Sequence, residues 1–341
     1  MTEKKIHIVG WGIAGSSMAW HLKDRGLSFE VHDSGHNHAT RIAAGMINPI
    51  GFRRQNKSWQ ADLLVPYALD FYMQKADILS ADIFRQADIY RVFTDVEEAN
   101  NWSARLGGDR YAEYMNWPAE SDFPNTQEID YPYGMGRVSG MHHLDTAEFL
   151  DLSKDYLQDE GVIFHNHNFD YNAITAEGIY IFCEGTGMWN NPIFKDLPLN
   201  GTHGETMDIK TDTYDFHHVI NKRLYLKPMG NKAYRIGATY NWELKEPIQT
   251  EEGKNELKER LNAFTNFDFE VTAFHAGIRP TVKDRRPLIG RDHSNENAFL
   301  FNGLGTKGVM VAPYYANQLC QFIFDNGQID EEVNLNRFRK T

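Results

Sequence analysis

The chain has 341 residues, of which 41% are hydrophobic and 13% aromatic, and this composition is that of a globular protein rather than a disordered one. Its length exceeds what one hydrophobic core comfortably holds and therefore predicts two domains. Lysine and arginine number 35 against 47 aspartates and glutamates, so the formal net charge of −12 argues against nucleic acid as a partner.

The cysteines and the N-terminus bear on the compartment. Cys183 and Cys320 show no CxxC pattern, and we expect both to be small core residues of a protein in a reducing environment. No apolar stretch reaches the roughly 18 residues of a membrane span, and no apolar segment precedes the first predicted strand. We therefore expect a cytoplasmic protein without a membrane span or signal peptide. The oligomeric state stays open.

The first pattern in the chain is a strand, a glycine-rich turn and a helix. Residues 6–9 form an apolar, strand-like run, and residues 10–15 then read Gly-Trp-Gly-Ile-Ala-Gly, a GxGxxG motif. Apolar residues continue at helical spacing up to Gly26, which is suited to end a helix. A second strand over 27–32 is followed by Asp33. Strand, turn, helix and acid in this order predict a dinucleotide site.

The residues of this motif have separate roles in such a site. Gly10 permits the tight turn, Gly12 lets the backbone approach a pyrophosphate, and Gly15 lets the helix pack against the strand. The diphosphate then lies against the unpaired amide groups of the helix N-terminus. Asp33 stands where an acid accepts a hydrogen bond from a ribose hydroxyl.

Further elements follow along the chain. We expect helices over 61–76, 97–106 and 251–264, strands over 89–93, 162–164 and 179–183, and a hairpin whose strands 224–228 and 233–240 flank a turn at 229–232. Asp145 begins a capping-box-like Asp-Thr-Ala-Glu sequence, and the helix that it opens stops at Gly161. Small residues at 43–45 would let the backbone lie close to a cofactor.

A second strand, glycine turn and helix lies near the opposite end of the chain. Residues 299–309 read Phe-Leu-Phe-Asn-Gly-Leu-Gly-Thr-Lys-Gly-Val, and we expect the helix after them to open at 311–313. A nicotinamide dehydrogenase has no need of this block. A flavin has, because its ring extends far beyond the pyrophosphate and carries negative charge when reduced, and free amides at a helix N-terminus stabilise that charge.

Five motifs occur in a fixed order along the chain. They are the GxGxxG with Asp33, Ala-Ala-Gly-Met-Ile-Asn-Pro at 43–49, Gly-Thr-Gly-Met-Trp at 185–189, Gly-Ile-Arg-Pro at 277–280, and the block from Gly303 to Pro313. In this order they resemble the glycine oxidase, D-amino acid oxidase and sarcosine oxidase family of FAD-dependent oxidoreductases. The segments at about 80–135 and 200–270 match this family only in outline, and we expect them to determine which substrate is bound.

The resemblance implies noncovalently bound FAD, because no cysteine stands near Arg279 and no histidine directly precedes Ala43 to link the flavin. Phe169 would offer its backbone to the adenine, and residues 306–309 would face the pyrimidine edge of the flavin. The residues implied in cofactor binding are Gly10, Gly12, Ile13, Ala14, Gly15, Asp33, Ser34, Thr40, Arg41, Ala44, Gly45, Met46, Phe169, Gly185, Thr186, Gly187, Trp189, Gly303, Leu304, Thr306, Lys307, Gly308 and Val309. We expect no metal, since the 14 histidines show no HExxH or other ligand spacing.

The implied fold is α/β. A discontinuous, Rossmann-like FAD-binding domain would take 1–80, 136–200 and 275–341. A second domain, mainly an antiparallel sheet with a helix, would take 81–135 and 201–274 and bind the substrate.

Arg279 is the residue that we expect to recognise the substrate, because a planar guanidinium binds a carboxylate through two parallel hydrogen bonds. An internal ion pair with an aspartate or glutamate is the alternative. Lys307 would stabilise the reduced flavin or assist oxygen reduction, or else be a solvated loop lysine. Tyr240 and Tyr225 would close the substrate pocket, unless they serve packing alone.

The activity implied is oxidation of the C–N bond of a small amino acid or secondary amine by hydride transfer to flavin N5, after which the imine is hydrolysed. No general base stands out in the sequence. Residues 284–290 and 303–308 also resemble the oxidase domain of a bacterial enzyme that removes a carboxymethyl group from a modified tRNA wobble uridine, although the charge argues against tRNA. A flavin-binding protein without turnover is a further alternative.

Overall fold

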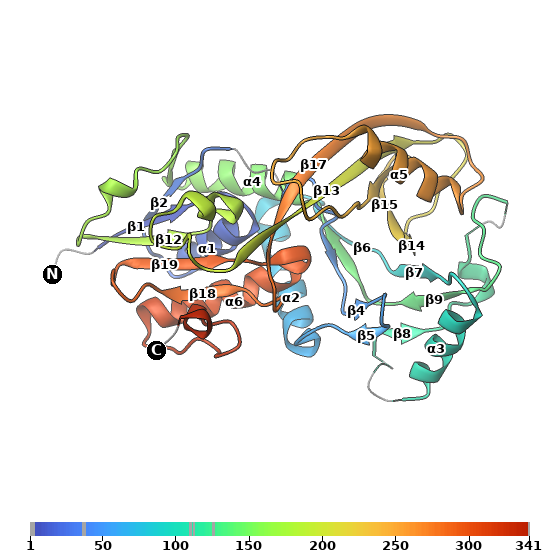
Figure 1. Cartoon of the computed structure of the whole chain (residues 1–341), viewed down its shortest axis with the longest axis horizontal. Coiled ribbons are helices and arrows are strands. Elements are labelled where there is room, and N and C mark those ends of the chain that lie inside the picture. The colour runs from blue at the N-terminus through green and yellow to red at the C-terminus, as the bar shows by residue number, and fades with distance from the viewer. Residues whose placement is uncertain (1–3, 36–38, 109–110, 112, 125–126, 340–341) are drawn as a thin grey trace.

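The computed structural model describes residues 4–35, 39–108, 111, 113–124 and 127–339. Within these residues the strands form one sheet of six strands, one of eight and two small ones. The two large sheets lie in different halves of the molecule (Figure 1). The α/β fold class predicted from the sequence is confirmed.

The six-stranded sheet is built around the N-terminal strand. Its order is β11 (Ile163–His165), β2 (Phe29–His32), β1 (Lys5–Val9), β12 (Gly178–Phe182), β19 (Ala298–Asn302) and β18 (Leu288–Arg291). All neighbours run parallel except β18, which is antiparallel to β19. Parallel strands need crossover connections, and these carry the helices to the faces of the sheet. The glycine turns after β1 and β19 thus open at the same edge.

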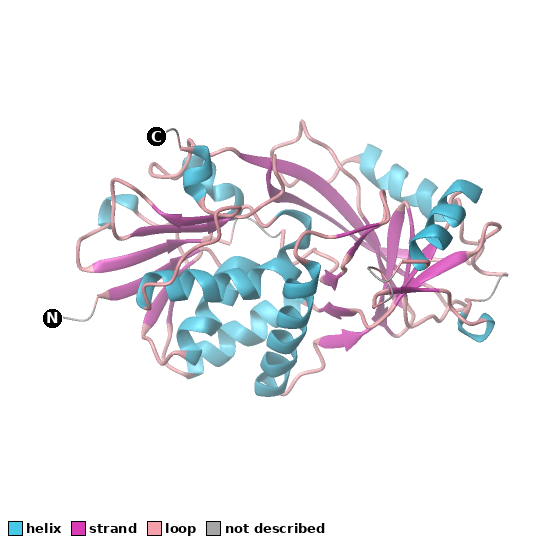
Figure 2. Ribbon diagram, turned by 90° about the horizontal axis from the view of Figure 1, so that it is seen from below, coloured by secondary structure: helices cyan, strands magenta, loops and turns pink. Residues whose placement is uncertain are grey.

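Helices lie together on one face of this sheet (Figure 2). They are α1 (Ile13–Asp24), α2 (Ala61–Leu79), α4 (Thr146–Asp159) and α6 (Gly308–Phe324), and α6 packs against both α1 and α2. Their buried side chains, among them Trp20, Leu64, Phe149 and Leu319, belong to one hydrophobic core. Asp145 caps α4 as predicted, since its carboxylate accepts a hydrogen bond from the amide of Glu148 at 3.2 Å.

The start of α6 differs from the prediction. The helix opens at Gly308 rather than at 311–313, and Pro313 lies inside it. Proline has no N–H and leaves the carbonyl four residues earlier without its helical partner. That carbonyl belongs to Val309, and the hydroxyl of Tyr72 on α2 donates to it at 3.0 Å. A neighbouring helix therefore satisfies the acceptor that the proline leaves free.

The eight-stranded sheet is antiparallel except where β14 pairs with β7. Its order is β17 (Glu270–Val282), β13 (Leu199–Lys210), β16 (Ala233–Gly237), β15 (Leu224–Gly230), β14 (Val219–Lys222), β7 (Ile89–Val92), β9 (Met135–Val138) and β8 (Met115–Asn116). Helix α5 (Glu251–Asn262) packs on this sheet through Leu257 and Leu261, and α3 (Val96–Leu106) lies beside β9. The predicted hairpin is β15 and β16, joined by Asn231 and Lys232 in left-handed conformations.

The smaller elements connect the two large sheets. One small sheet contains β3 (Met46–Ile47), β10 (His142–Leu144) and β6 (Phe84–Gln86), and the other β4 (Ile50–Gly51) and β5 (Asn56–Lys57). Short 3₁₀ turns are η1 (Glu120–Asp122), η2 (Tyr171–Ala173), η3 (Gly185–Asn190), η4 (Gly305–Lys307) and η5 (Leu335–Phe338). No helix of the described residues is long and apolar enough to cross a membrane.

Long strands run across the proposed domain boundaries. The boundary at 135/136 falls inside β9, and the boundary at 274/275 falls inside β17. β17 pairs along its whole length with β13, from Leu199 opposite Val282 to Lys210 opposite Glu270. This two-stranded ribbon carries side chains from the eight-stranded sheet to the edge of the six-stranded one (Figure 1).

Candidate active site

The turn after β1 has the geometry that its glycines predict. Gly10 has a φ of +103°, and a Cβ there would lie 2.5 Å from the carbonyl oxygen of Cys183. A Cβ at Gly15 would overlap the carbonyl oxygen of Gly10, so α1 packs closely on the turn. Asp33, at the end of β2, accepts a hydrogen bond from the amide of Trp11 at 3.0 Å. Turn, helix and acid are thus joined in one unit.

The C-terminal glycine block meets this unit directly. A Cβ on Gly308 would lie 3.2 Å from Cγ2 of Ile13, so the first turns of α6 and α1 touch. Neither helix has a side-chain cap or an acidic residue in its first turn. Two helix N-termini therefore meet at one place, where the amide of Ile13 donates to the hydroxyl of Thr40 at 3.1 Å, and the positive ends of both helix dipoles favour binding of negative charge there.

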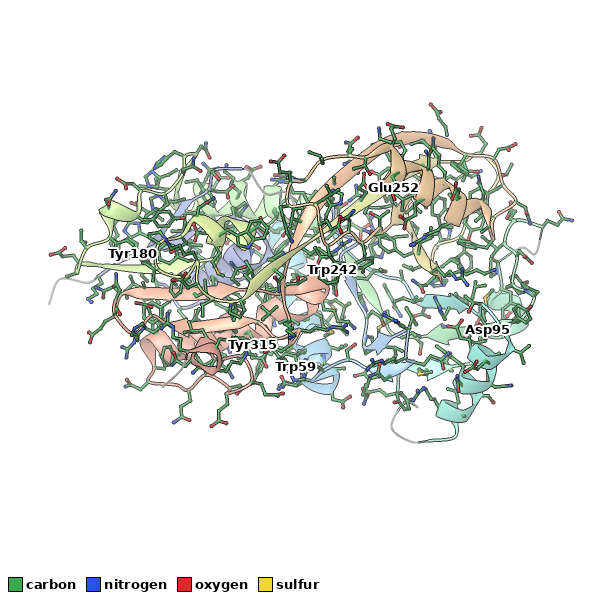
Figure 3. All side chains as sticks on the ribbon, in the orientation of Figure 1. Trp59, Asp95, Tyr180, Trp242, Glu252 and Tyr315 are labelled. Atoms are coloured by element: carbon green, nitrogen blue, oxygen red, sulfur yellow. The ribbon has the colours of Figure 1, made fainter. Side chains whose placement is uncertain are left out.

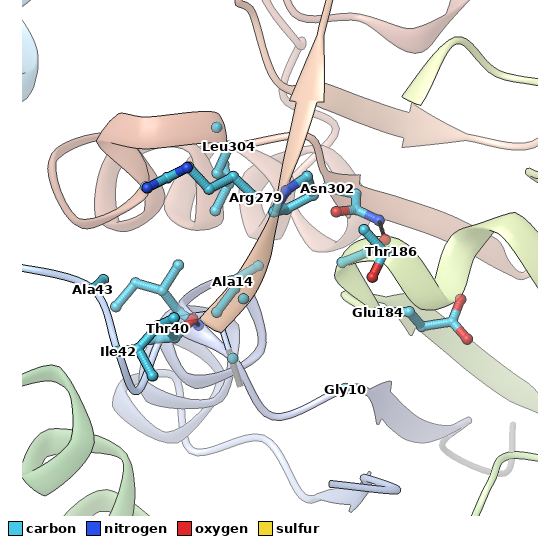
Figure 4. A pocket seen from close by; sticks show the side chains of 18 of the residues that line it. Gly10, Ala14, Thr40, Ile42, Ala43, Glu184, Thr186, Arg279, Asn302 and Leu304 are labelled. Atoms are coloured by element: carbon cyan, nitrogen blue, oxygen red, sulfur yellow. Dashed lines mark hydrogen bonds between the residues drawn. The ribbon is translucent and has the colours of Figure 1, made fainter. Parts of the chain in front are cut away.

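Both helix starts line one cavity of about 800 Å³, shown in Figure 4. This volume is within the range of roughly 300 to 1,000 Å³ that is typical of small-molecule and cofactor sites. Most of the residues implied in cofactor binding line it, namely Gly10, Gly12, Ile13, Ala14, Asp33, Ser34, Thr40, Ala44, Gly45, Met46, Phe169, Gly185, Thr186, Gly187, Trp189, Leu304, Thr306, Gly308 and Val309. The structure thus brings together segments from five separate parts of the chain.

Four residues of the implied set lie outside the lining. Gly15 and Gly303 shape the backbone behind it, and Gly303 has a φ of +72°. Arg41 forms an ion pair with Asp151 at 2.5 Å on the surface. Lys307 lies next to the lining but points elsewhere, since its ammonium donates to the carbonyl of Asn48 at 2.7 Å and to the hydroxyl of Ser58.

Lys307 is half-buried, its ammonium has no carboxylate partner among the described residues, and desolvation lowers its pKa to about 8. Its two hydrogen bonds hold the segment around Asn48 and Ser58 against the start of α6. The geometry therefore describes Lys307 as a side chain that positions this segment.

The sequence analysis missed two polar residues that lie between the glycine turns. Glu184 lines the cavity, accepts hydrogen bonds from Tyr171 at 2.6 Å and Asn191 at 2.7 Å, and has its pKa raised by burial. The amide of Asn302 donates to the carbonyl of Gly185 at 2.8 Å and so joins β19 to η3. Their position directly at the ends of parallel strands is the signal that could have indicated them.

Arg279 projects from β17 into the other end of the cavity (Figure 4). Its guanidinium lies against Gly204, where any Cβ would overlap it. Cζ of Arg279 is 4.6 Å from the ring centre of Tyr240. Its hydrogen-bond acceptors are the carbonyls of His203 and Thr239, at 3.4 and 3.5 Å. Within the described chain no carboxylate forms an ion pair with Arg279, so the alternative of an internal ion pair finds no support.

Other residues at this end come from the eight-stranded sheet and its loops. The lining there includes Thr206, Asn221, Tyr225, Ala238, Tyr240 and Lys245. Tyr240 is 58% exposed and stands at the rim, whereas burial raises the pKa of Tyr225. Asn221 accepts a hydrogen bond from Arg91 at 2.5 Å, which orients its amide. The acids that line the cavity, Asp33 and Glu184, lie with the glycine turns instead.

Histidines that are far apart in the sequence meet beside Asp33. His7, His32, His165 and His167 lie in mutual contact with Glu30, and His32 and His167 also line the cavity. Burial, with the neighbouring imidazoles, lowers the pKa of His32 to about 4. A cluster of this kind leaves no metal-ligand motif in the sequence, because three different strands bring its residues together.

The chain matches the family model of FAD dependent oxidoreductases (DAO) over residues 5–322. The chain belongs to this FAD-dependent oxidoreductase family. It is 30% identical over 159 residues to a glycine oxidase from Bacillus subtilis, a match that spans 44% of the chain and 41% of that enzyme's length. It is 21% identical to a tRNA 5-methylaminomethyl-2-thiouridine biosynthesis bifunctional protein from Marinobacter nauticus, of which it spans 55%. The fold matches that of a glycine oxidase from Geobacillus kaustophilus with a TM-score of 0.83, at 16% identity over 99% of both chains.

The residues present fit the FAD of this family. The Gly10 turn and the start of α1 form the cradle that a pyrophosphate needs, and any Cβ at Gly10 would strike the neighbouring strand. The second helix start, at Gly308, lies beside it and would stabilise the negative charge of a reduced flavin ring. The cavity continues from there to Arg279.

Replacing Gly10 tests the cradle. The Gly10→Ala variant is expected to lose bound flavin, because the new Cβ would displace the turn from Cys183 and the φ of +103° is unfavourable for alanine. The flavin absorbance per chain and the dissociation constant of FAD measure the effect. Gly26→Ala is the matched control, since Gly26 also has a positive φ but its Cβ would meet nothing within 4 Å. Equal flavin content in both variants would contradict the assignment.

The buried ammonium of Lys307 predicts a pH dependence. Its pKa is about 8 in the folded chain and about 10.4 in an unfolded one, so between these values the unfolded state holds more protons and the free energy of unfolding rises with pH. The Lys307→Met variant should lack this rise. The free energy of unfolding of the wild type, relative to that of the variant, should therefore increase by up to about 1.4 kcal/mol per pH unit from pH 8 to 10.4. Denaturant titrations at several pH values measure it, and parallel curves would refute the buried charge.

Proposed function

We propose that the chain uses FAD to oxidise the C–N bond of a small amino acid or a secondary amine that carries a carboxylate. The observation that carries the proposal is the Arg279 guanidinium at the far end of the cofactor cavity, which donates to two carbonyls and forms no ion pair with a carboxylate of the described residues. The similarity to glycine oxidase supports it, since glycine is a small amino acid. The product would be an imine, which water hydrolyses.

Arg279 would bind the carboxylate of the substrate. Its present acceptors are two carbonyls at long distances, which leaves hydrogen-bonding capacity in the guanidinium. Gly204 lets the guanidinium lie flat on β13, and Tyr240 faces it from the other side at 4.6 Å. A planar group held in this way presents two parallel N–H bonds in a fixed direction, and orientation of the substrate supplies much of the rate.

FAD, when bound, supplies the acceptor for the hydride of the α-carbon. The side chains at the Arg279 end of the lining include no aspartate, glutamate or histidine among the described residues. No carboxylate or imidazole base of the chain stands ready there, so we expect the substrate to react as the neutral amine. Tyr225 would exclude water from beneath it, and Tyr240 would cover the entrance.

The test of this function is anaerobic mixing of the purified flavin-loaded chain with amino acids and N-methyl amines. Bleaching of the flavin absorbance by at least one carboxylate-bearing amine is expected, and amines of the same size without a carboxylate should react far more slowly. A flavin that no amine reduces would overturn the proposal and favour a flavin-binding protein without turnover.

The Arg279→Met variant tests the residue that recognises the substrate. It should raise KM for a carboxylate-bearing amine roughly 100-fold or more, because a charged, partly buried hydrogen-bond partner is lost. Flavin content should stay that of the wild type. Arg53→Met is the control, as Arg53 is exposed on the turn after β4. An unchanged KM in Arg279→Met would remove the basis of the proposal.

A further inference from the structure

Three neighbouring strands of the six-stranded sheet bring imidazoles to one face. His7 lies on β1, His32 on β2 and His165 on β11, and the pairing sets His165 opposite His32 and His7 opposite Glu30. Side chains two residues apart on a strand share a face, so Glu30 and His32 project on the same side. His167 joins them from the segment after β11, with its ring 5.9 Å from that of His32. The cluster ends on Tyr180, which stacks on His7 at 4.9 Å and is labelled in Figure 3.

Contacts within the cluster leave particular nitrogens free. Nδ1 of His7 lies 3.0 Å from Nε2 of His32, and Nε2 of His165 lies 2.9 Å from Oε2 of Glu30. Glu30 also pairs with Lys5 at 2.5 Å. Nε2 of His32 is therefore in contact with His7, and Nε2 of His165 with Glu30. The other ring nitrogen of each histidine faces away from that neighbour.

Nδ1 of His32 is buried and has no hydrogen-bond partner among the described residues. His32 as a whole is only 9% exposed. A buried polar atom without a partner costs free energy, and such a site in a folded protein calls for an explanation. A ligand that accepts the nitrogen lone pair supplies one.

We propose that His32, His165 and His167 bind a divalent transition-metal ion of the Zn²⁺ class, and that Glu30 and His7 orient two of these ligands from outside. Ligand atoms of the three histidines all lie within 4.8 Å of one another. Nitrogens bound to Zn²⁺ at about 2.0–2.1 Å in tetrahedral geometry lie about 3.4 Å apart, so the rings of His32 and His165, which are stacked with their centres 4.5 Å apart, must turn toward His167 to share one ion. A carboxylate that accepts the second N–H of a metal-bound histidine is the usual outer partner in zinc sites.

The donor set selects both the position and the kind of ion. His7, Glu30 and His32 form an alternative group, but their atoms are already taken by each other, by Lys5 and by His165. Imidazole nitrogens favour Zn²⁺, Ni²⁺ and Cu²⁺ over Mg²⁺ and Ca²⁺, which prefer oxygen. The site does not depend on the amine oxidation proposed above, because none of its residues lies at the Arg279 end of the cavity.

Titration of the flavin-loaded chain with Zn²⁺ tests the site, with calorimetry or a chromophoric chelator as the readout. We expect one saturable ion per chain, and a visible ligand-field spectrum when Co²⁺ replaces Zn²⁺. His167→Gln should weaken Zn²⁺ binding at least tenfold, and Glu30→Gln by about 10- to 100-fold through loss of the outer contact. His167 is exposed, so its replacement should leave the fold intact, and because it also lines the cofactor cavity the flavin content of the variant is measured alongside.

His217→Gln is the matched control, because the His217 side chain is 85% exposed and lies outside the cluster. It should bind Zn²⁺ as the wild type does. No saturable Zn²⁺ binding by the wild-type chain would overturn the proposal, and so would equal binding by wild type and His167→Gln. The Co²⁺ complexes of the wild type and of His167→Gln should differ in their ligand-field spectra. Identical spectra would mean that the assignment of the ligands is wrong.

Discussion

The contact between the first turns of α1 and α6 is the constraint on which the rest of the site depends. Ile13 and Gly308 are separated by nearly the whole chain, yet a Cβ on Gly308 would touch the Ile13 side chain. Glycine at this position lets two helix N-termini approach without an intervening side chain. Because neither helix start carries an acidic residue, the positive ends of both helix dipoles add at one point.

Several other features exist to hold that contact. Tyr72 satisfies the carbonyl that Pro313 leaves free, so α6 continues as a helix across the back of α1 and α2. Lys307 ties the segment around Asn48 to the same helix start, although a buried ammonium without a carboxylate is costly. Asn302 joins the end of β19 to Gly185. Together these bonds hold in place the ends of neighbouring parallel strands, which form the floor of the cavity.

The cavity divides its charges along its length. Asp33 and Glu184 lie near the glycine turns, where the ribose and pyrophosphate of FAD belong, and the guanidinium of Arg279 lies at the opposite end. The Arg279 end of the cavity has no carboxylate among its described lining residues, which would favour the carboxylate of the proposed substrate there.

The sequence by itself determined the local elements. Strand, turn and helix at both ends follow from hydrophobic period and glycine spacing, and the observed strands β1, β2, β11 and β12 agree with the expected ones within two residues at each end. The start of α6 was misjudged because proline is a weak guide once another helix can satisfy the carbonyl. Most of the cofactor-binding residues that the family motifs name line the cavity, since these motifs are backbone features at strand ends.

Only the tertiary structure decided what depends on pairing between distant strands. Gly204 and Arg279 are neighbours because β13 and β17 run antiparallel in one particular register, and no local pattern fixes that register. The histidine cluster arises in the same way, from single residues on β1, β2 and β11 whose spacing along the chain carries no metal-site signal. Local structure depends on short-range sterics and hydrophobic periodicity. Side-chain constellations depend instead on which strands become neighbours, and burial of the whole core decides that.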